Sequence, residues 1–212
     1  MVITYYGLQF FKIQLGDLVI ALNPTSKQSQ RKPPRFGADI ALVTLNHPDF
    51  NGVENLSHGD RQPFVISGPG EYEIKQVFVK GYLTKTHYGG EEEKVNTIYY
   101  LALDGMDMCF LGALDTPLVG DDILEDIGNV DILFVPVGGR GVLTSGGAYK
   151  ASFALEPKII IPMHYGEPSG VALKKFVEEA GTEGIKPVEK LTLKKKDLDG
   201  KEGEIMVLKP LI

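Results

Sequence analysis

Short apolar stretches separated by turn residues fill the first half of the chain. Three of them open it, at residues 2–6, 8–14 and 18–23, and each is rich in β-branched or aromatic residues, which favours strands. Gly16-Asp17 lies between the last two and predicts a hairpin turn. Residues 38–45, "ADIALVTL", are almost continuously apolar, as in a strand that is covered on both faces.

A polar loop and four more predicted strands complete the first half. Residues 24–37 are polar and rich in proline, so we expect a surface loop. The strands are expected at residues 63–68, 72–84, 96–103 and 106–111. Asp104-Gly105 joins the last two and is the strongest hairpin dipeptide in the chain.

Helices and apolar strands alternate from residue 116 onward. Helices are predicted at residues 116–130, 145–156 and 168–181. The first and the third show apolar positions at helical spacing, and Gly181 is the expected stop signal of the third. Strands are predicted at residues 130–137, 157–163, 187–193 and 204–210.

The order of these elements predicts the fold class. No internal repeat and no linker divides the sequence, so we expect a single domain over residues 1–212. Strands come first, and helices alternate with strands only later, which predicts two sheets packed face to face with helices outside them. The predicted class is α+β, in a layered αββα arrangement.

Composition and charge exclude one class of partner. Hydrophobic residues make up 43% of the chain and charged residues 24%, which is typical of a water-soluble globular protein. The net charge of −6 argues against a protein that binds nucleic acid through its phosphates. We interpret the basic residues Arg31, Lys32 and Arg35, and those at 194–196, as solvated charges of a loop and an edge strand.

The sequence indicates neither a membrane segment nor an oxidising compartment. No apolar run is long enough to span a bilayer, and "MVITYYG" lacks the basic region of a signal peptide. The single cysteine, Cys109, has no partner for an internal disulfide and is expected to fill the core. We therefore expect a cytoplasmic protein without a membrane partner.

Three of the four histidines follow predicted strands. His47, His87 and His164 each come just after an apolar run, and Asp115 follows "MCFLGAL" in the same way. Loops at strand ends are where such scaffolds tend to place functional side chains. His58 is expected in a loop or at a helix end and has no such placement.

Convergence of these side chains would create a metal site. Imidazole is the commonest neutral metal ligand, and Asp49, two residues after His47, adds a hard oxygen. A histidine at a strand end is also common as a surface or capping residue, and this remains the alternative for each one taken alone.

The segments "ITYYG", "ISGPGEYEI", "VDILFVPVGG" and "EPKIIIPMHYG" follow one another along the chain. In their order they resemble the metallo-β-lactamase superfamily, most closely its ascorbate-phosphate-lactonase-like branch of metal-dependent hydrolases. The resemblance implies a four-layer αββα sandwich with a metal site at one edge of the two sheets. Relatives in this branch form oligomers, so it also implies a homo-oligomer.

Four ligand places of that family are retained. The family's loop His-x-His-x-Asp-His corresponds to residues 45–50, "LNHPDF", which keep His47 and Asp49. His87 and His164 match two further ligand histidines. The resemblance implies that one ion would keep His47 and His87, and that the other would keep Asp49 and His164.

Three ligand places hold apolar residues instead. Leu45 and Phe50 stand where the loop has its first and last histidines, and Ala113 stands at the place of the bridging acid. Asn23-Pro24 also replaces a usual Asp-Pro. Because these apolar side chains cannot coordinate a metal, we interpret Leu45 and Phe50 as side chains that fill a vacated cavity.

Two interpretations of the site follow. Two ligands per ion are too few for a hydrolytic zinc site, which generally needs three protein ligands and an open position for water. The leading hypothesis is a depleted dinuclear site in a non-hydrolytic protein with a binding or structural role. The alternative is a mononuclear metal-dependent hydrolase that acts on a small ester, lactone or phosphorylated metabolite.

In the alternative, a single zinc, iron or manganese ion would be bound by residues from several loops. These ligands would be His47, Asp49, His87 and His164, with Asp115 as a further candidate. Asp49 would either ligate the ion or orient water as a general base.

The glycine-rich segment 137–147, "VGGRGVLTSGG", follows a predicted strand and precedes a predicted helix. Gly138, Gly139 and Arg140 could receive a small anionic ligand through backbone amides and a guanidinium group. The simpler interpretation is a flexible connection in which Ser145 caps the helix. No Gly-Lys-Ser/Thr follows, so the segment is not a nucleotide-binding P-loop.

Two pairs of aromatic residues have two explanations. Tyr5-Tyr6 and Tyr99-Tyr100 could form contacts between copies of the chain, or they could pack in the core.

Overall fold

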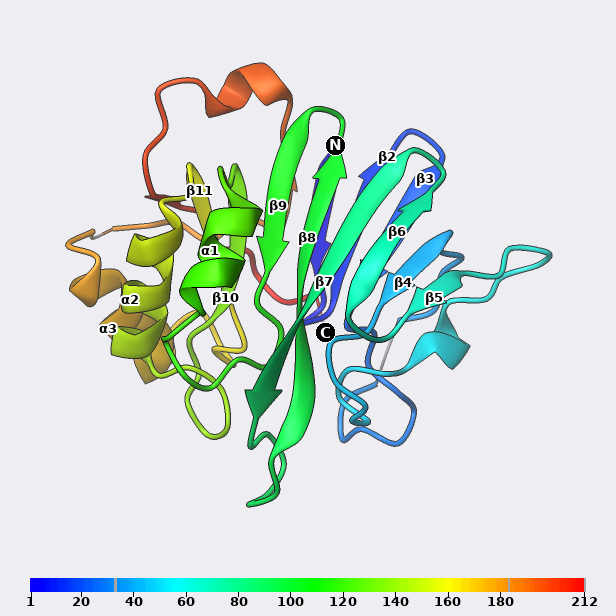
Figure 1. The fold of residues 1–212 in the computed structure, drawn as a ribbon, viewed down its shortest axis with the longest axis horizontal. Helices are drawn as coiled ribbons and strands as arrows, with labels where there is room; N and C mark the ends of the chain where they lie inside the picture. The colour runs from blue at the N-terminus through cyan, green and yellow to red at the C-terminus, as the bar shows by residue number, and fades with distance from the viewer. Residues whose placement is uncertain (33, 183, 212) are drawn as a thin grey trace.

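The computed structural model describes residues 1–32, 34–182 and 184–211, and it consists of two β-sheets packed face to face (Figure 1). Within these residues the first sheet is six-stranded, in the order β12-β1-β2-β3-β4-β5. Its strands are β1 (Val2–Tyr5), β2 (Phe11–Leu15), β3 (Leu18–Leu22), β4 (Ile40–Leu42), β5 (Phe64–Ile66) and β12 (Lys190–Thr192). β3, β4 and β5 are parallel, so the loops that follow them leave the sheet at the same edge.

The second sheet is seven-stranded in the described parts of the chain, in the order β13-β11-β10-β9-β8-β7-β6. Its strands are β6 (Gly70–Ile74), β7 (Val77–Thr86), β8 (Lys94–Leu103), β9 (Met106–Phe110), β10 (Ile132–Pro136), β11 (Ile159–Met163) and β13 (Glu204–Ile205). β9, β10 and β11 are parallel. The loops that follow these three strands therefore gather at one edge, which is the lower edge in Figure 1.

Two predicted hairpins are confirmed, and the structure adds a third. The β2–β3 connection turns at Gly16 (φ 57°), and the β8–β9 connection turns at Asp104-Gly105 (φ 55° and 68°). The stretch 72–84, predicted as a single strand, instead forms parts of β6 and β7 with a turn at Lys75 and Gln76. Both turn residues have positive φ (50° and 64°), a conformation that a sequence normally signals with glycine or asparagine.

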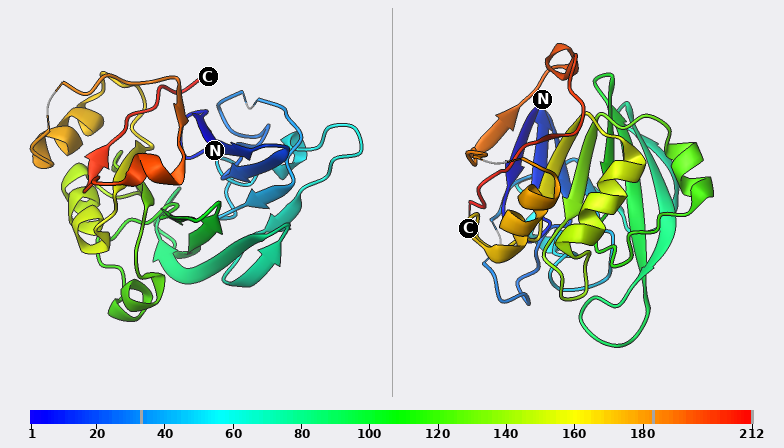
Figure 2. Two further views of the ribbon diagram at one scale, coloured as in Figure 1. Left: turned by 90° about the horizontal axis from the view of Figure 1, so that it is seen from above. Right: turned by 90° about the vertical axis from the view of Figure 1, so that its left-hand side faces the viewer.

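In the described residues, α-helices cover the outer face of the second sheet only (Figure 2). The three predicted helices are confirmed as α1 (Asp121–Ile127), α2 (Ser145–Leu155) and α3 (Val171–Glu179). The outer face of the first sheet is covered by the 3₁₀ helix η1 (Val53–Asn55) and by the loop 24–37, of which Pro33 lies outside the described residues. Phe10 and Phe36 pack there with ring centroids 5.8 Å apart. The αββα arrangement thus has a loop and a short helix as one of its outer layers.

A second 3₁₀ helix, η2 (Lys195–Leu198), lies between β12 and β13. No helix in the described parts of the chain combines the length and the apolarity that a bilayer crossing requires.

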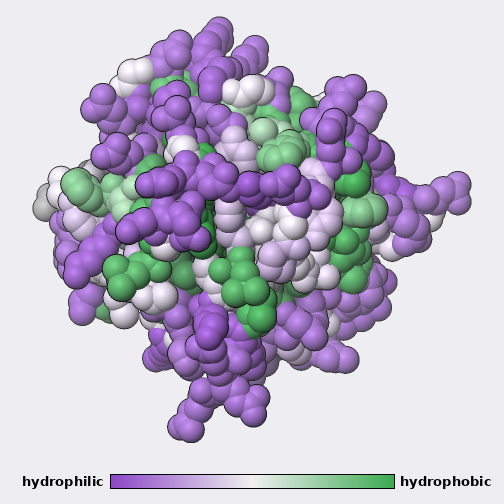
Figure 3. Space-filling view, in the orientation of Figure 1, coloured by the Kyte–Doolittle hydropathy of each residue, from purple (hydrophilic) through white to green (hydrophobic). Residues whose placement is uncertain are grey.

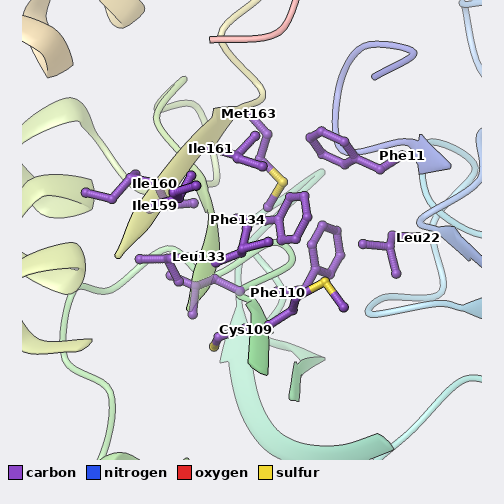
Figure 4. Close-up of a cluster of buried hydrophobic side chains, with 14 of the residues drawn as sticks. Phe11, Leu22, Cys109, Phe110, Leu133, Phe134, Ile159, Ile160, Ile161 and Met163 are labelled. Carbon is purple, nitrogen blue, oxygen red and sulfur yellow. The ribbon is translucent and has the colours of Figure 1, made fainter. Parts of the chain in front are cut away.

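The hydrophobic core lies between the two sheets (Figure 4). Phe11 of β2 packs against Phe134 of β10 with ring centroids 4.9 Å apart, and against Phe110 of β9 at 6.4 Å. Cys109 is fully buried beside Phe110, which confirms it as a core residue. These contacts between strands of different sheets hold the two layers together.

Tyr5, Tyr99 and Tyr100 contribute to this core, whereas Tyr6 packs with Phe10 and Phe36 on the outer face of the first sheet. Tyr5 and Tyr99 are fully buried, and Tyr6 and Tyr100 are half-buried.

The face of the molecule in Figure 3 is mostly hydrophilic, with hydrophobic residues in separate areas, and the tip of the β7–β8 hairpin at the bottom is hydrophilic. A homo-oligomer and a cytoplasmic location stay predictions.

A buried aspartate precedes an interior strand in each sheet, Asp39 before β4 and Asp131 before β10. Each carboxylate accepts hydrogen bonds from a backbone N–H of the neighbouring strand and from a lysine ammonium group. Asp131 lies 2.8 Å from Nζ of Lys158 and 2.6 Å from Nζ of Lys195. Burial raises the pKa of Asp131, but the hydrogen bonds from the two lysines more than offset this, so the pKa lies below its usual range.

Replacing Asp131 by asparagine should lower the free energy of unfolding by about 1–3 kcal/mol at neutral pH, because a buried carboxylate loses two charge-assisted hydrogen bonds. The folded state binds the Asp131 proton more weakly than the unfolded state does. The stabilisation is therefore present above the usual aspartate pKa of about 4 and is lost as the pH falls through the lower pKa of the folded state.

Urea unfolding of the parent and of Asp131→Asn at neutral and acidic pH measures this difference. Glu91→Gln, at an exposed position of the β7–β8 loop, serves as the control and should leave the stability unchanged. A loss of stability in Asp131→Asn that does not shrink at acidic pH would contradict the role given to the ionised carboxylate.

Candidate functional site

The loops that carry the predicted site residues meet at one edge of the two sheets (Figure 1). His47 lies in the loop after β4, and His164 follows β11 directly. His87 follows the end of β7, and Asp115 lies in the loop after β9. The predicted position of each residue, just beyond a strand, is therefore confirmed.

Two aromatic rings pack against both His47 and His164. The ring centroid of Tyr88 lies 4.9 Å from that of His47 and 5.5 Å from that of His164. The ring of Phe50 lies 6.0 Å and 6.1 Å from the same two imidazoles and 4.8 Å from Tyr88. The same two aromatic rings therefore contact both imidazoles.

The three apolar residues at the ligand places pack into one group, which we call the apolar cluster. It consists of Leu45, Phe50, Tyr88, Ala113 and Val142. Phe50 and Ala113 have no exposed surface, and Leu45 is 4% exposed. The apolar cluster thus occupies the place where the resemblance implies a pair of metal ions.

Backbone hydrogen bonds fold the loop after β4 back on itself. The N–H of Phe50 donates to the carbonyl of His47 at 2.8 Å, and the N–H of His47 donates to the carbonyl of Leu45 at 2.9 Å. At Gly52 a Cβ would lie 2.1 Å from the carbonyl oxygen of Thr25, so only glycine allows the loop to return this closely. The folded loop turns Leu45 and Phe50 into the apolar cluster.

Hydrogen bonds already engage Nδ1 of His47 and both carboxylate oxygens of Asp49. Nδ1 of His47 accepts the N–H of Asp49 at 3.2 Å, and burial lowers the pKa of His47. A Cβ at Gly89 would lie 2.9 Å from Nε2 of His47, so the β7–β8 loop lies close to the other ring nitrogen. The two carboxylate oxygens of Asp49 accept hydrogen bonds from the hydroxyls of Ser29 and Tyr88, the latter at 2.8 Å.

His87 and Asp115 pair with each other outside the apolar cluster. The His87 side chain is 56% exposed, and its Nδ1 lies 2.8 Å from Oδ2 of Asp115. The same oxygen accepts the backbone N–H of His87 at 2.8 Å. Tyr88, and not His87, turns towards His47 and His164, so the structure does not bring the three predicted histidines to one point.

His164 has a buried nitrogen without a partner. Its Nδ1 is buried and makes no hydrogen bond to the described residues. Burial lowers the pKa of His164 to about 4, and the nearby charge of Arg31 acts in the same direction, so the imidazole is neutral at pH values near 7. The backbone N–H of His164, at φ 59°, donates to the carbonyl of Leu8 at 2.7 Å.

The glycine-rich segment passes directly over the backbone of His164. A Cβ at Gly138 would lie 1.9 Å from the carbonyl oxygen of His164, and Gly139 has a positive φ of 64°. The close approach explains Gly138 without a ligand, and a ligand-binding role for these glycines stays a prediction. The prediction that Ser145 caps α2 is wrong, because the side chain of Thr144 accepts a first-turn N–H at 3.2 Å and is the cap.

The side chains do not fit a catalytic metal ion. Among the described residues, no group of three or more His, Cys, Asp or Glu side chains is placed so that it could hold one. A hydrolytic zinc ion generally needs three protein ligands and an open position for water. Tyr88 packs against His47 and His164, and His87 pairs with Asp115 outside the apolar cluster. Three ligands therefore do not face one point.

Three residues of the site were not predicted from the sequence: Ser29, Arg31 and Tyr88. Tyr88 directly follows a candidate ligand, and the alternation of side chains along a strand is the signal that could have drawn attention to it. Arg31, interpreted from the sequence as a solvated loop charge, lines cavities beside both His47 and His164.

Known proteins share the sequence pattern of this chain. Residues 2–164 match the beta-lactamase superfamily domain. A UPF0173 metal-dependent hydrolase of Salinibacter ruber is 26% identical over 200 residues, which cover 78% of this chain and 84% of that protein. A UPF0173 metal-dependent hydrolase of Carboxydothermus hydrogenoformans is 28% identical over 196 residues, again with 78% and 84% covered.

A solved structure shares the fold over nearly the whole chain. It is a candidate zinc-dependent hydrolase of the metallo-beta-lactamase superfamily from Thermotoga maritima, with a TM-score of 0.78 and 25% identity, and the match covers 98% of this chain and 97% of that one. The matched domain, the two packed sheets and the loops that meet at one edge lead to the same assignment. This chain belongs to the beta-lactamase superfamily and has the metallo-β-lactamase fold.

Proposed function

We propose that this chain is a non-hydrolytic member of the superfamily with a binding or structural role, in which the apolar cluster has replaced the metal pair. The observation that carries this proposal is the packing of Leu45, Phe50 and Ala113 with Tyr88. Burial of a leucine or phenylalanine side chain stabilises the folded state by about 1.5–3 kcal/mol. Ligand side chains at the same places would instead be buried polar groups that need a bound ion as partner.

The chemistry of hydrolysis supports the same proposal. A metal-dependent hydrolase relies on an ion that lowers the pKa of bound water to about 7. Asp49, the candidate general base, already accepts two hydroxyl hydrogen bonds. His47 accepts a backbone N–H and lies against an aromatic ring. Both side chains are therefore already held by neighbouring groups.

A mononuclear metal-dependent hydrolase is the second candidate function. The names of the relatives from Salinibacter ruber and Carboxydothermus hydrogenoformans favour it, and the unpartnered Nδ1 of His164 would be one available donor. For this candidate the substrate would be a small ester, lactone or phosphorylated metabolite. The loop after β4 and the β7–β8 loop would both have to move so that His87 joins His47 and His164.

Metal content distinguishes the two candidates. Protein purified without chelator should contain far less than one zinc, iron or manganese ion per chain, because too few ligands face one point. Mass spectrometry of the elements in the intact protein measures this. Near-stoichiometric metal, together with ester, lactone or phosphoester hydrolysis that is lost in His164→Ala, would refute the non-hydrolytic proposal and establish the second candidate.

Restoring the missing donors should restore metal binding. The combined variant Leu45→His, Phe50→His and Ala113→Asp should take up zinc that the parent does not. It introduces metal-binding side chains at three positions that now carry apolar ones. The matched control, Leu45→Ala with Phe50→Ala, opens the same space without adding donors and should take up none. Circular dichroism shows whether both variants fold, and a folded restored variant without metal would count against the proposal.

The apolar cluster should behave as part of the core. Phe50→Ala should lower the free energy of unfolding by about 3–5 kcal/mol, because it empties a fully buried position. Phe153→Ala removes the same ring from a position that is 72% exposed and should change the stability by less than about 0.5 kcal/mol. Equal effects of the two substitutions in urea unfolding would show that the cluster does not support the fold.

A further inference from the structure

A cavity of about 720 Å³ lies beside the apolar cluster, on the side of His164. Its wall is built from the glycine-rich segment after β10, from the residues that follow β11, from the start of α2 and from one side of α3. Leu8 and Arg31 complete the wall, and Arg31 also lines the smaller cavity that contains His47 and Asp49. The larger cavity is therefore adjacent to the former metal site and separate from its packed centre.

Positive charge gathers in this cavity, although the whole chain carries a net charge of −6. Arg31, Arg140 and Lys175 line it, and Glu179 is the single acid among its described lining residues. Within the described parts of the chain, none of the three cations forms an ion pair. A concave surface with unpaired cations attracts anions more strongly than the net charge would suggest.

The starts of two helices also face the cavity. Ser145 and Gly146 of α2 and Val171 and Ala172 of α3 lie in its wall. The Ser145 hydroxyl donates to the carbonyl of Ala172 at 2.8 Å, which fixes the two starts next to each other. The N-cap of α3 is Gly170, which has no side chain to accept a hydrogen bond, so the first-turn N–H groups of α3 are available to an anion.

The remaining wall offers a neutral histidine and an apolar surface. His164 lines the cavity, and its Nδ1 is buried behind the surface without a partner among the described residues. Leu8, Val137 and Tyr165 add apolar surface. A mostly pre-formed cavity of this size, with apolar walls and a few polar groups, suits a small organic molecule.

We propose that this cavity binds the carboxylate or phosphate group of a small organic anion and does not cleave it. Arg31 and Arg140 hold the oxyanion through their guanidinium groups, Lys175 adds a third positive charge, and the first turn of α3 donates backbone N–H groups. The apolar wall contacts the carbon part of the ligand. That the ligand remains uncleaved rests on the proposed non-hydrolytic function, whereas the contacts to the oxyanion do not.

Calorimetric titration of the full chain tests this inference with two probes. Phenylphosphonate, whose carbon–phosphorus bond resists hydrolysis, represents the phosphate group, and phenylacetate represents the carboxylate group. At least one of them should bind at one site per chain, and the tighter probe identifies the preferred group. Binding should weaken as salt is added, should be unchanged by EDTA, and should be absent for the neutral analogue benzyl alcohol.

Variants locate the bound anion. Arg31→Gln and Arg140→Gln should each weaken binding by about tenfold or more, because each removes a charge-assisted hydrogen bond. Glu179→Gln should strengthen binding, since it removes the acid from the wall. Lys32→Gln and Lys174→Gln remove exposed cations next to Arg31 and Lys175 but outside the cavity, and they should leave the affinity unchanged.

The outcomes separate this inference from the proposed function. Absence of binding by both probes, or an equal loss of affinity in the Lys32→Gln and Lys174→Gln controls, would overturn the anion site and leave the metal question unaffected. Binding that EDTA abolishes would overturn both proposals, because a metal would then hold the anion. Cleavage of phenyl phosphate that still depends on Arg31 and Arg140 would uphold the anion site and contradict the non-hydrolytic function.

Discussion

The packing of Phe50 and Tyr88 against His47 and His164 determines what this edge of the molecule can do. Metal chemistry in this fold needs imidazoles and carboxylates that point at a shared space, and here aromatic carbon lies against both imidazoles. Tyr88 also donates its hydroxyl to Asp49. The aromatic residue therefore both contacts the histidines and engages the neighbouring carboxylate.

The cavity beside the apolar cluster lies at the same edge of the fold. The scaffold retains its parallel strands and the loops that leave them at one edge, so the site still has the walls of a binding pocket. Arg31, Arg140 and Lys175 bring unpaired charge to those walls. Under the proposed function, this cationic, partly apolar cavity would recognise a small molecule without converting it.

Much of the fold follows from local sequence signals, because alternating or continuous apolar runs and Gly-Asp or Asp-Gly turns report directly on strands and hairpins. The turn at Lys75 and Gln76 escaped prediction, since both residues adopt a left-handed conformation without the glycine or asparagine that would signal it. β4 is also shorter than its apolar run, with three residues in the ladder. The apolar residues after β4 instead continue into the loop and the apolar cluster.

The candidate site was predictable in position but not in detail. The resemblance placed Leu45, Phe50 and Ala113 correctly at one edge, where they share a cluster. Which of His87 and Tyr88 turns inward depends on the end of β7 and on the pairing of His87 with Asp115, and no local pattern encodes that choice. Arg31 lies in a loop without periodicity, so its approach to His164 appears only in three dimensions.

X-ray anomalous scattering from crystals soaked in zinc tests the central claim most directly, because it locates an ion and the side chains around it in one measurement. We expect the rings of Phe50 and Tyr88 to stay packed against His47 and His164, with no anomalous peak between these two histidines. A strong peak coordinated by His47, His87 and His164, with Tyr88 displaced from the cluster, would contradict the account.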